Sequence, residues 1–322
     1  MISADHQIAC PLPLDFDLHR VEGSLRQLQL SHPISFKALA ATGRQMDLEP
    51  SNFALLFETV ELGDRDGSSI KPVAVWNEAA SKYCDIMKRA VREGASGRNR
   101  TSFLKGDWGT TLAGRASLLG PSWNAFVGAV AVQEFNAGMG LVSAAPTGGA
   151  SGTVPGTLVA VSDAIGVELS KQVASLFVAG LVGRVAFGRG PVSGAQAGCG
   201  GEVGIAAGMA AGGVAYLLGG SWEQIDAAAS LAGTPFVGLE CSPTQGLVEY
   251  PCVPRNGFAA LCAIAAAEAA CAGIVPPYGL DETFDRIFGI GRLLPGSLRE
   301  TNDGDWAAPA CRTGGCNRCG SK

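Results

Sequence analysis

A series of long runs rich in Ala, Gly and Val constrains the fold of this chain most strongly. Their apolar positions recur with helical spacing, and no run shows the sustained period-two alternation of a strand. The chain holds 45 glycines, about twice the usual share of ~7%, although each weakens a helix by about 1 kcal/mol relative to alanine. We therefore predict an all-α fold in which buried Ala/Gly-rich helices approach closely and functional loops lie between them. The runs cover residues 122–140, 156–187, 202–218, 222–234 and 256–273.

The front of the chain has a more ordinary amphipathic composition. Residues 35–62 and 71–94 predict helices with polar faces. We therefore divide the chain into an N-terminal helical segment (1–100), a core that carries the function (101–300) and a polar, Cys-containing tail (301–322).

Charge and hydropathy exclude several classes of function. Only 16% of the residues are charged, the net charge is −5 and no Lys/Arg run stands out, which argues against nucleic-acid binding. Residues 135–162 and 203–222 carry no charge and are long enough to span a bilayer. Neither has basic flanks, so we expect buried helices and no membrane insertion. The N-terminus lacks the pattern of a secretory signal peptide, which predicts a cytoplasmic location.

Ten cysteines in such a chain point to metal binding, because disulfides are rare in reducing compartments. Cys199, Cys241 and Cys252 each lie in a loop rich in Gly or Pro, where backbone amides can turn toward sulfur. Three thiolates on an iron–sulfur cubane leave one iron without a protein ligand, and that iron can act as a Lewis acid. Their spacing is no general metal signature, so buried thiols that act as small hydrophobes are the alternative. We prefer this alternative for the cysteines on helix-like runs, which are Cys84, Cys262 and Cys271.

The segment SAAPTGGASGTVPG, from residue 143 to 156, alternates hydroxyl side chains with glycines just before a predicted helix. A Gly-rich loop that leads into a helix N-terminus suits an anion such as an amino-acid carboxylate. A tight turn without a ligand is the alternative. A nucleotide-binding P-loop is excluded because its Lys-Ser/Thr signature is absent from the sequence.

Three tail cysteines, Cys311, Cys316 and Cys319, have the spacing C-x4-C-x2-C. Ferredoxin-type clusters use this spacing with a fourth cysteine elsewhere. A zinc site or a thiol-rich end without function are the alternatives.

Four segments in order resemble the catalytic α chain of the iron–sulfur L-serine dehydratases. They are VQEFNAGMGLVSAAPTGGASGTVPG, SGAQAGCGGEVGIAAGMAAGG, GLECSPTQGLVEYPCVPRN and LPGSLRETNDG. The resemblance implies a [4Fe–4S] cluster on Cys199, Cys241 and Cys252, with Cys311 as a tail ligand that substrate displaces. It also implies β-elimination of L-serine to pyruvate and ammonia, a separate β chain and a homodimer.

The resemblance and the loop chemistry together nominate the site residues. Removal of the α-proton needs a positioned base, for which we consider acidic or basic side chains near the motifs or an N-terminal histidine. The candidate bases are Lys105, Asp107, Glu134 and Glu202. The expected substrate contacts are Asn136, Thr147, Gly149 and Ser151, while Arg255 and Asn256 are expected to bind substrate or to orient the cluster loop.

Several positions depart from the family pattern and bear on the substrate. The family's Asp after the second cysteine is Ser242, its Val-Ala is Thr244-Gln245, and its A-G-S is Gly148-Gly149-Ala150. A different β-substituted amino acid is therefore an alternative to serine. A cysteine desulfidase, or a non-catalytic cluster or zinc protein acting as a redox sensor, are the further alternatives.

Overall fold

The computed structural model describes residues 23–28, 31, 33–65, 73–97, 99–301 and 304, and within them the chain is all-α, which confirms the predicted fold class. The one strand-like feature of these residues is an isolated bridge between Cys241 and Arg299. The α-helices are α2 (Phe36–Gln45), α3 (Pro50–Arg65), α4 (Val73–Gly94), α5 (Trp108–Ala113), α6 (Ser122–Ala137), α7 (Thr153–Ile165), α8 (Leu169–Arg189), α9 (Gly194–Cys199), α10 (Ile205–Leu217), α11 (Trp222–Gly233), α12 (Cys252–Cys271) and α13 (Leu280–Leu293). Short 3-10 or π turns include η1 (Gly148–Ala150) and η2 (Gly200–Gly204).

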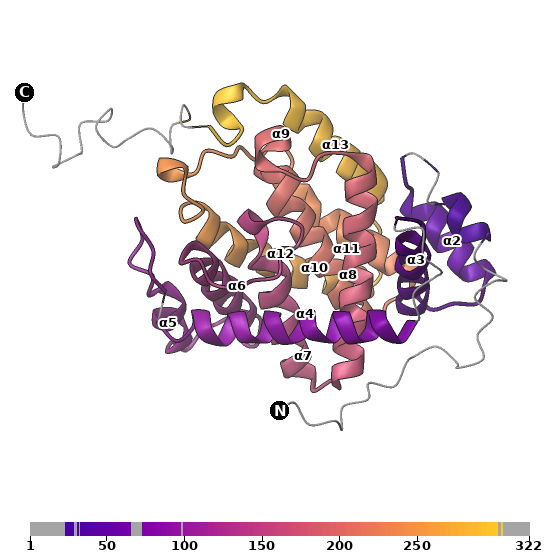
Figure 1. Ribbon diagram of the computed structural model, residues 1–322, viewed down its shortest axis with the longest axis horizontal. Helices are drawn as coiled ribbons and strands as arrows, with labels where there is room; N and C mark the ends of the chain where they lie inside the picture. The colour runs from indigo at the N-terminus through magenta and orange to yellow at the C-terminus, as the bar shows by residue number, and fades with distance from the viewer. Residues whose placement is uncertain are drawn as a thin grey trace, which may run out of the picture.

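Helix α10 forms the centre of the core. Every residue from Ile205 to Leu217 is buried, because α7, α8, α11 and α12 surround it. Its sequence is almost entirely Ala, Gly and Val with single larger residues, so it presents no polar face to solvent. The long helix α4 crosses the body below this core, with α2 and α3 beyond one of its ends and α5 near the other (Figure 1).

Small residues let the helix backbones come together, as the composition predicts. A Cβ atom added at Gly156 of α7 would lie 2.3 Å from the backbone nitrogen of Ala129 in α6. No side chain fits in that space, so glycine is required for the α6–α7 packing.

The structure divides one predicted run and adds three helices. The run 156–187 is two helices, because Gly166 ends α7 in a left-handed conformation (φ 67°) and Glu168 is extended. Helices α5, α9 and α13 were not among the predicted helices. Two of them, α5 and α9, are six residues long, which is too short to show a periodic pattern.

Neither uncharged run of the sequence forms one continuous α-helix. Residues 135–162 comprise the end of α6, a loop, η1 and most of α7. Residues 203–222 include the end of η2, α10 and a turn. Within the described residues, α8 is the one helix with the length and composition of a membrane-crossing segment. It packs against α10, α3 and α4.

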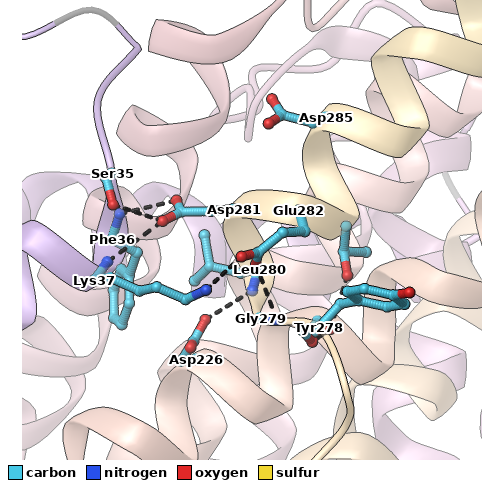
Figure 2. A network of polar contacts seen from close by, with 12 residues as sticks. Ser35, Phe36, Lys37, Asp226, Tyr278, Gly279, Leu280, Asp281, Glu282 and Asp285 are labelled. Atoms are coloured by element: carbon cyan, nitrogen blue, oxygen red, sulfur yellow. Dashed lines mark hydrogen bonds and ion pairs between the residues drawn. The ribbon is translucent and has the colours of Figure 1, made fainter.

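A polar joint fastens the start of α2 to α13 (Figure 2). Asp281 accepts hydrogen bonds from the backbone nitrogens of Phe36 (2.9 Å) and Lys37 (3.4 Å) and from Ser35 Oγ (2.7 Å). It thereby satisfies N–H groups that the first turn of α2 leaves without a helical partner. Arg189 of α8 donates to the same carboxylate at 3.4 Å, so three distant segments meet here.

Candidate metal and substrate site

Two of the three predicted cysteine ligands meet beside a carboxylate. The Sγ atoms of Cys199 and Cys241 and a carboxylate oxygen of Glu202 all lie within 4.8 Å of one another, and all three residues are buried. Cys199 lies close enough to Cys241 to raise the pKa of the Cys241 thiol. Cys252 is also buried, and it lies close enough for charge on Cys199 and Glu202 to raise the pKa of its thiol.

Cys199 is placed by the glycines on either side of it. It ends α9, and η2 follows directly. Gly198 has a φ of 66°, and a Cβ atom there would lie 2.5 Å from the carbonyl oxygen of Leu239. The backbone nitrogen of Gly200 donates to that same carbonyl at 3.2 Å. The glycines therefore let the turn that carries Cys199 lie against the segment that leads into Cys241.

Cys241 is held by the chain near residue 300. Its backbone nitrogen donates to the carbonyl of Leu298 at 2.8 Å, and its carbonyl accepts from the nitrogen of Glu300. This pairing is the isolated parallel bridge of the fold. It draws LPGSLRET, the last of the four family-like segments, to the candidate site.

Cys252 begins α12 and is tied to the hydroxyl-rich loop by Asn256. The side-chain amide of Asn256 is fully buried and donates to the carbonyls of Cys252 and Gly149, both at 2.9 Å. Its oxygen accepts from the nitrogens of Gly152 (3.0 Å) and Thr153 (2.9 Å). All the polar atoms of this amide have partners inside the protein, which makes Asn256 a positioning residue for the loop that begins α7.

Glu202 lies between the thiols and the hydroxyl-rich loop. Thr147 donates its hydroxyl to one carboxylate oxygen at 2.8 Å. Cβ atoms added at Gly149 or Gly194 would each lie 2.9 Å from the other oxygen, so these glycines leave its surroundings open. Burial raises the pKa of Glu202, while the hydrogen bonds from Thr147 and Gly194 oppose that shift.

Arg255 reaches all three cysteine segments. It lies in the first turn of α12, three residues after Cys252. Its Nη1 donates to the carbonyl of Glu240 at 2.9 Å, and its Nη2 pairs with the Glu240 carboxylate. The guanidinium also lies close enough to Cys199 for that group to raise the pKa of Arg255, whereas burial lowers it.

The donor set fits a thiolate-bound cluster. The pKa of Cys241 is raised by the neighbouring Cys199 and by burial, and the pKa of Cys252 is raised chiefly by burial. Buried thiols that raise one another's pKa stay protonated unless a cation compensates their charge. A metal centre supplies that cation, and soft sulfur ligands favour iron–sulfur clusters or zinc.

The structure also locates the other predicted residues. Ser151 is fully buried and donates to Gln133 at 3.1 Å, while Asn136 Nδ2 donates to the carbonyl of Gly148 at 2.8 Å. Lys105 and Asp107 are exposed side chains in the segment before α5.

Glu134, another of the candidate bases, is buried and already accepts hydrogen bonds from the backbone. Its two carboxylate oxygens accept from the backbone nitrogens of Trp108 (3.0 Å) and Gly109 (2.8 Å), which begin α5. Burial raises the pKa of this carboxyl group. Among the four candidate bases, Glu202 is therefore the one that the structure brings beside the cysteine thiols.

Sequence reasoning missed two acidic residues of the site region. Glu249, which is 2% exposed, accepts from the consecutive backbone nitrogens of Ser102, Phe103 and Leu104 at 2.6–2.7 Å. Glu240 pairs with Arg255. Glu240 directly precedes Cys241 and Glu249 stands three positions before Cys252, and an acidic residue at such a position has no distinctive pattern, although its closeness to a predicted cysteine ligand was a usable signal for both.

Some predictions lie outside the described residues. These are the tail ligand Cys311, the further tail cysteines Cys316 and Cys319, and the N-terminal histidines His6, His19 and His32.

The described residues form a helical domain with a buried group of two thiols and one carboxylate, a donor set of the kind that suits a metal ion. The chain belongs to the serine dehydratase alpha chain family, whose model matches residues 42–305. It is 40% identical over 229 residues to a probable L-serine dehydratase, alpha chain, of Bacillus subtilis (strain 168), across 69% of this chain and 76% of that protein. A protein of the same description from Latilactobacillus sakei is 38% identical over 56% of this chain and 86% of the relative.

A longer relative matches over a smaller share of its length. L-serine dehydratase 1 of Escherichia coli (strain K12) is 40% identical over 182 residues. The match covers 56% of this chain and 40% of the Escherichia coli protein. The family resemblance expected from the four segments is thereby confirmed, and the family is one of lyases that are named for L-serine.

Proposed function

We propose that this chain is the catalytic part of a [4Fe–4S]-dependent dehydratase that deaminates L-serine, or a closely related β-hydroxy amino acid, to a 2-oxo acid and ammonia. The observation that carries the proposal is the meeting of Cys199, Cys241 and Glu202 in one buried site. Membership of a family whose relatives are named L-serine dehydratase supports the reaction. The thiol donor set supports the cluster.

Cys199, Cys241 and Cys252 would hold the cluster, with Cys311 as a candidate fourth ligand. When bound, the cluster supplies a Lewis-acidic iron for the departing hydroxyl group. The chain itself must remove the α-proton, and we assign this step to Glu202. Burial raises the pKa of Glu202, which makes its carboxylate a stronger base, and Thr147 fixes one of its oxygens.

The hydroxyl-rich loop would bind the amino-acid end of the substrate. Thr147 and Gly149 lie directly at Glu202, and Asn136 lies at the exposed side of the same loop. Ser151 and Asn256 are buried behind it and would shape the loop from within. A side chain at position 149 would meet the second carboxylate oxygen of Glu202 at 2.9 Å, so glycine keeps this approach to the carboxylate clear.

We further propose a cytoplasmic enzyme with a separate β chain, assembled as a homodimer. Relatives of this chain are named as alpha chains, which implies a companion chain.

Anaerobic reconstitution with iron and sulfide tests the proposal. We expect bound iron and acid-labile sulfide, followed by formation of pyruvate and ammonia from L-serine. Cys199→Ala, Cys241→Ala and Cys252→Ala should each lose bound iron. Cys262→Ala, on the same helix as Cys252 but outside the site, is the matched control and should retain it.

Two outcomes would overturn this function. Full iron content in all three cysteine variants would show that the cluster does not bind here. Release of sulfide from cysteine, without any turnover of serine or another β-hydroxy amino acid, would point to a desulfidase instead. Glu202→Gln should keep the iron and lose turnover, which separates the base from the ligands.

A further inference from the structure

Gln133 of α6 has no part in the function proposed above, yet its side chain is fully enclosed beside the hydroxyl-rich loop. Its exposed fraction is 0%. A buried side-chain amide needs hydrogen-bond partners, because leaving its polar atoms without them is costly. The partners of Gln133 therefore show which parts of the molecule this residue holds in place.

The amide nitrogen of Gln133 joins two segments that are far apart in the sequence. Its Nε2 donates to the carbonyl of Gly148 at 3.2 Å and to the carbonyl of Val248 at 3.4 Å. Gly148 begins η1 in the hydroxyl-rich loop, and Val248 lies in the segment that leads into α12. Asn136 also donates to the Gly148 carbonyl, at 2.8 Å. The contribution that Gln133 adds is the connection between the loop and Val248.

The amide oxygen of Gln133 has a partner as well. It accepts the hydroxyl of Ser151 at 3.1 Å, and Ser151 is itself fully buried. A glutamine side chain supplies two N–H donors and an acceptor from one planar group, whereas an ionised glutamate supplies acceptors only. Glutamine therefore matches two carbonyls and one hydroxyl at this position, and neither glutamate nor an apolar residue does.

Val248 lies next to a contact that fixes the start of α12. The carbonyl of Glu249 accepts from the backbone nitrogen of Val253 at 2.8 Å, in the first turn of the helix that Cys252 begins. A hydrogen bond to the Val248 carbonyl therefore acts on the backbone that leads directly into the Cys252 segment.

The hydroxyl-rich loop is thus held from two helices. Gln133 of α6 holds the carbonyl of Gly148, and Asn256 of α12 holds the carbonyl of Gly149 at 2.9 Å. The carboxylate of Glu202 lies beside Gly149, where an added Cβ atom would be 2.9 Å from its oxygen. The same contacts therefore place the loop next to the proposed base.

We propose that Gln133 is a positioning residue that fixes the hydroxyl-rich loop relative to the segment leading into Cys252. The loop carries the proposed substrate contacts and Cys252 is a proposed metal ligand, so their relative position determines whether a small substrate meets both. The effect on substrate rests on the proposed function, whereas the hold on the two segments is a property of the protein alone.

Hydrogen exchange of the full chain without a cluster provides the first test. Gln133→Met removes all three hydrogen bonds at similar side-chain length, so the amides of residues 150–153 and 247–253 should both exchange about tenfold faster than in the parent. Ser151→Ala removes only the contact with the amide oxygen, so faster exchange should be confined to residues 150–153. Unchanged exchange in both segments of Gln133→Met would overturn the positioning role, and a change in the loop alone would overturn the link to Val248.

Two further variants support this test. Gln172→Met is the matched control, because Gln172 of α8 also donates its Nε2 to a backbone carbonyl, that of Val167 at 3.1 Å, but lies outside the site. It should leave exchange in both segments as in the parent. Gln133→Glu keeps the shape of the side chain and turns carboxylate oxygens toward two carbonyls. It should speed exchange at least as much as Gln133→Met, and it decides the question if the methionine variant does not fold.

Steady-state kinetics of the reconstituted enzyme provide the second test. Gln133→Met should raise the KM for L-serine about tenfold and retain the iron content of the parent. KM does not depend on the fraction of protein that is active, so a lower yield of folded enzyme cannot produce this result. Gln172→Met should keep the KM of the parent.

The two hypotheses fail in different ways. If the parent chain takes up no iron or consumes no L-serine, the proposed function fails, and the hydrogen-exchange comparison still decides whether Gln133 holds the two segments. If the parent is active and Gln133→Met keeps its KM although both segments exchange faster, the function stands and the role of Gln133 in placing the substrate is rejected.

Discussion

In two joints of this molecule, buried carboxylates hold distant segments together by accepting their backbone N–H groups. The two joints differ in how the charge of the carboxylate is balanced. At the α2–α13 joint, Asp281 accepts backbone N–H groups of α2 (Figure 2). It is also paired with Arg189. Beside the candidate site, Glu249 and Glu134 accept backbone N–H groups of residues 102–109. Within the described residues, no cation is among the hydrogen-bond partners of these two glutamates.

This difference predicts how strongly each joint responds when its carboxylate is replaced by an amide. A carboxylate with a guanidinium partner keeps part of its stabilisation if one amide contact changes. A buried carboxylate that is neutralised by amide dipoles alone depends on both of its oxygens being acceptors. We therefore expect the joint beside the site to be the more sensitive of the two to replacement of a carboxylate by an amide.

Glu249→Gln should have the largest effect. One oxygen becomes an NH₂ group that faces a backbone N–H donor, so a buried donor loses its acceptor. Hydrogen bonds to charged groups contribute about 1.5–3 kcal/mol each, and we expect a loss of about 3 kcal/mol in the free energy of unfolding. Chemical denaturation measures this loss, and limited proteolysis should show faster cleavage within residues 99–107.

The exposed acid Glu268 of α12 provides the control for this change. Glu268→Gln should alter the free energy of unfolding by less than about 0.5 kcal/mol. Equal stability losses in the two variants would mean that Glu249 has no special role in holding the 102–104 backbone.

Asp281→Asn should come second, with a loss of about 2 kcal/mol, because it removes the charged acceptor at the start of α2 but leaves Arg189 its contact with Asp285. Thermal and chemical denaturation of this variant and of Glu249→Gln under the same conditions give the comparison directly. A larger loss at Asp281 than at Glu249 would reverse the ranking and reject the argument from charge balance.

These joints show which features of the structure a local sequence pattern does not predict. The helical spacing of the Ala/Gly-rich runs predicted the all-α class, because that pattern is local. The segments around Cys199, Cys241 and Cys252 were predicted as the site from their residue types and the family resemblance. They were predicted as loops, whereas Cys199 ends α9 and Cys252 begins α12. Glu249 and Asp281 act on backbone more than 140 residues away in sequence, and no local pattern reveals such a partner.

Glu134 gives a third and smaller effect, which appears in the pH dependence of stability. Burial raises its pKa in the folded protein. The folded state then binds more protons than the unfolded state between the unfolded pKa of about 4.3 and the raised folded value. Stability contributed by this group is therefore greatest at low pH and falls as pH rises through that window.

Glu134→Gln removes this titration. The free energy of unfolding of the variant should therefore increase relative to that of the parent as pH rises from about 4. Denaturant titrations at a series of pH values measure it, and other buried acids cancel in the difference. A difference that stays constant across the window would show that Glu134 keeps its unfolded pKa.

The smallest expected effect lies at the exposed edge of the α2–α13 joint. Lys37 and Glu282 form an ion pair whose side chains are 56% and 44% exposed. Exposed pairs contribute about 0.2–1 kcal/mol and are weakened by salt, so Lys37→Ala should cost no more than about 0.5 kcal/mol. A double-mutant cycle with Glu282→Ala, at low and high salt, isolates the pair. A coupling energy above about 2 kcal/mol that does not fall with salt would show that Lys37 contributes to the α2–α13 joint. Two cations, Arg189 and Lys37, would then balance the acidic charge of that joint, whereas Glu249 and Glu134 accept only backbone N–H groups.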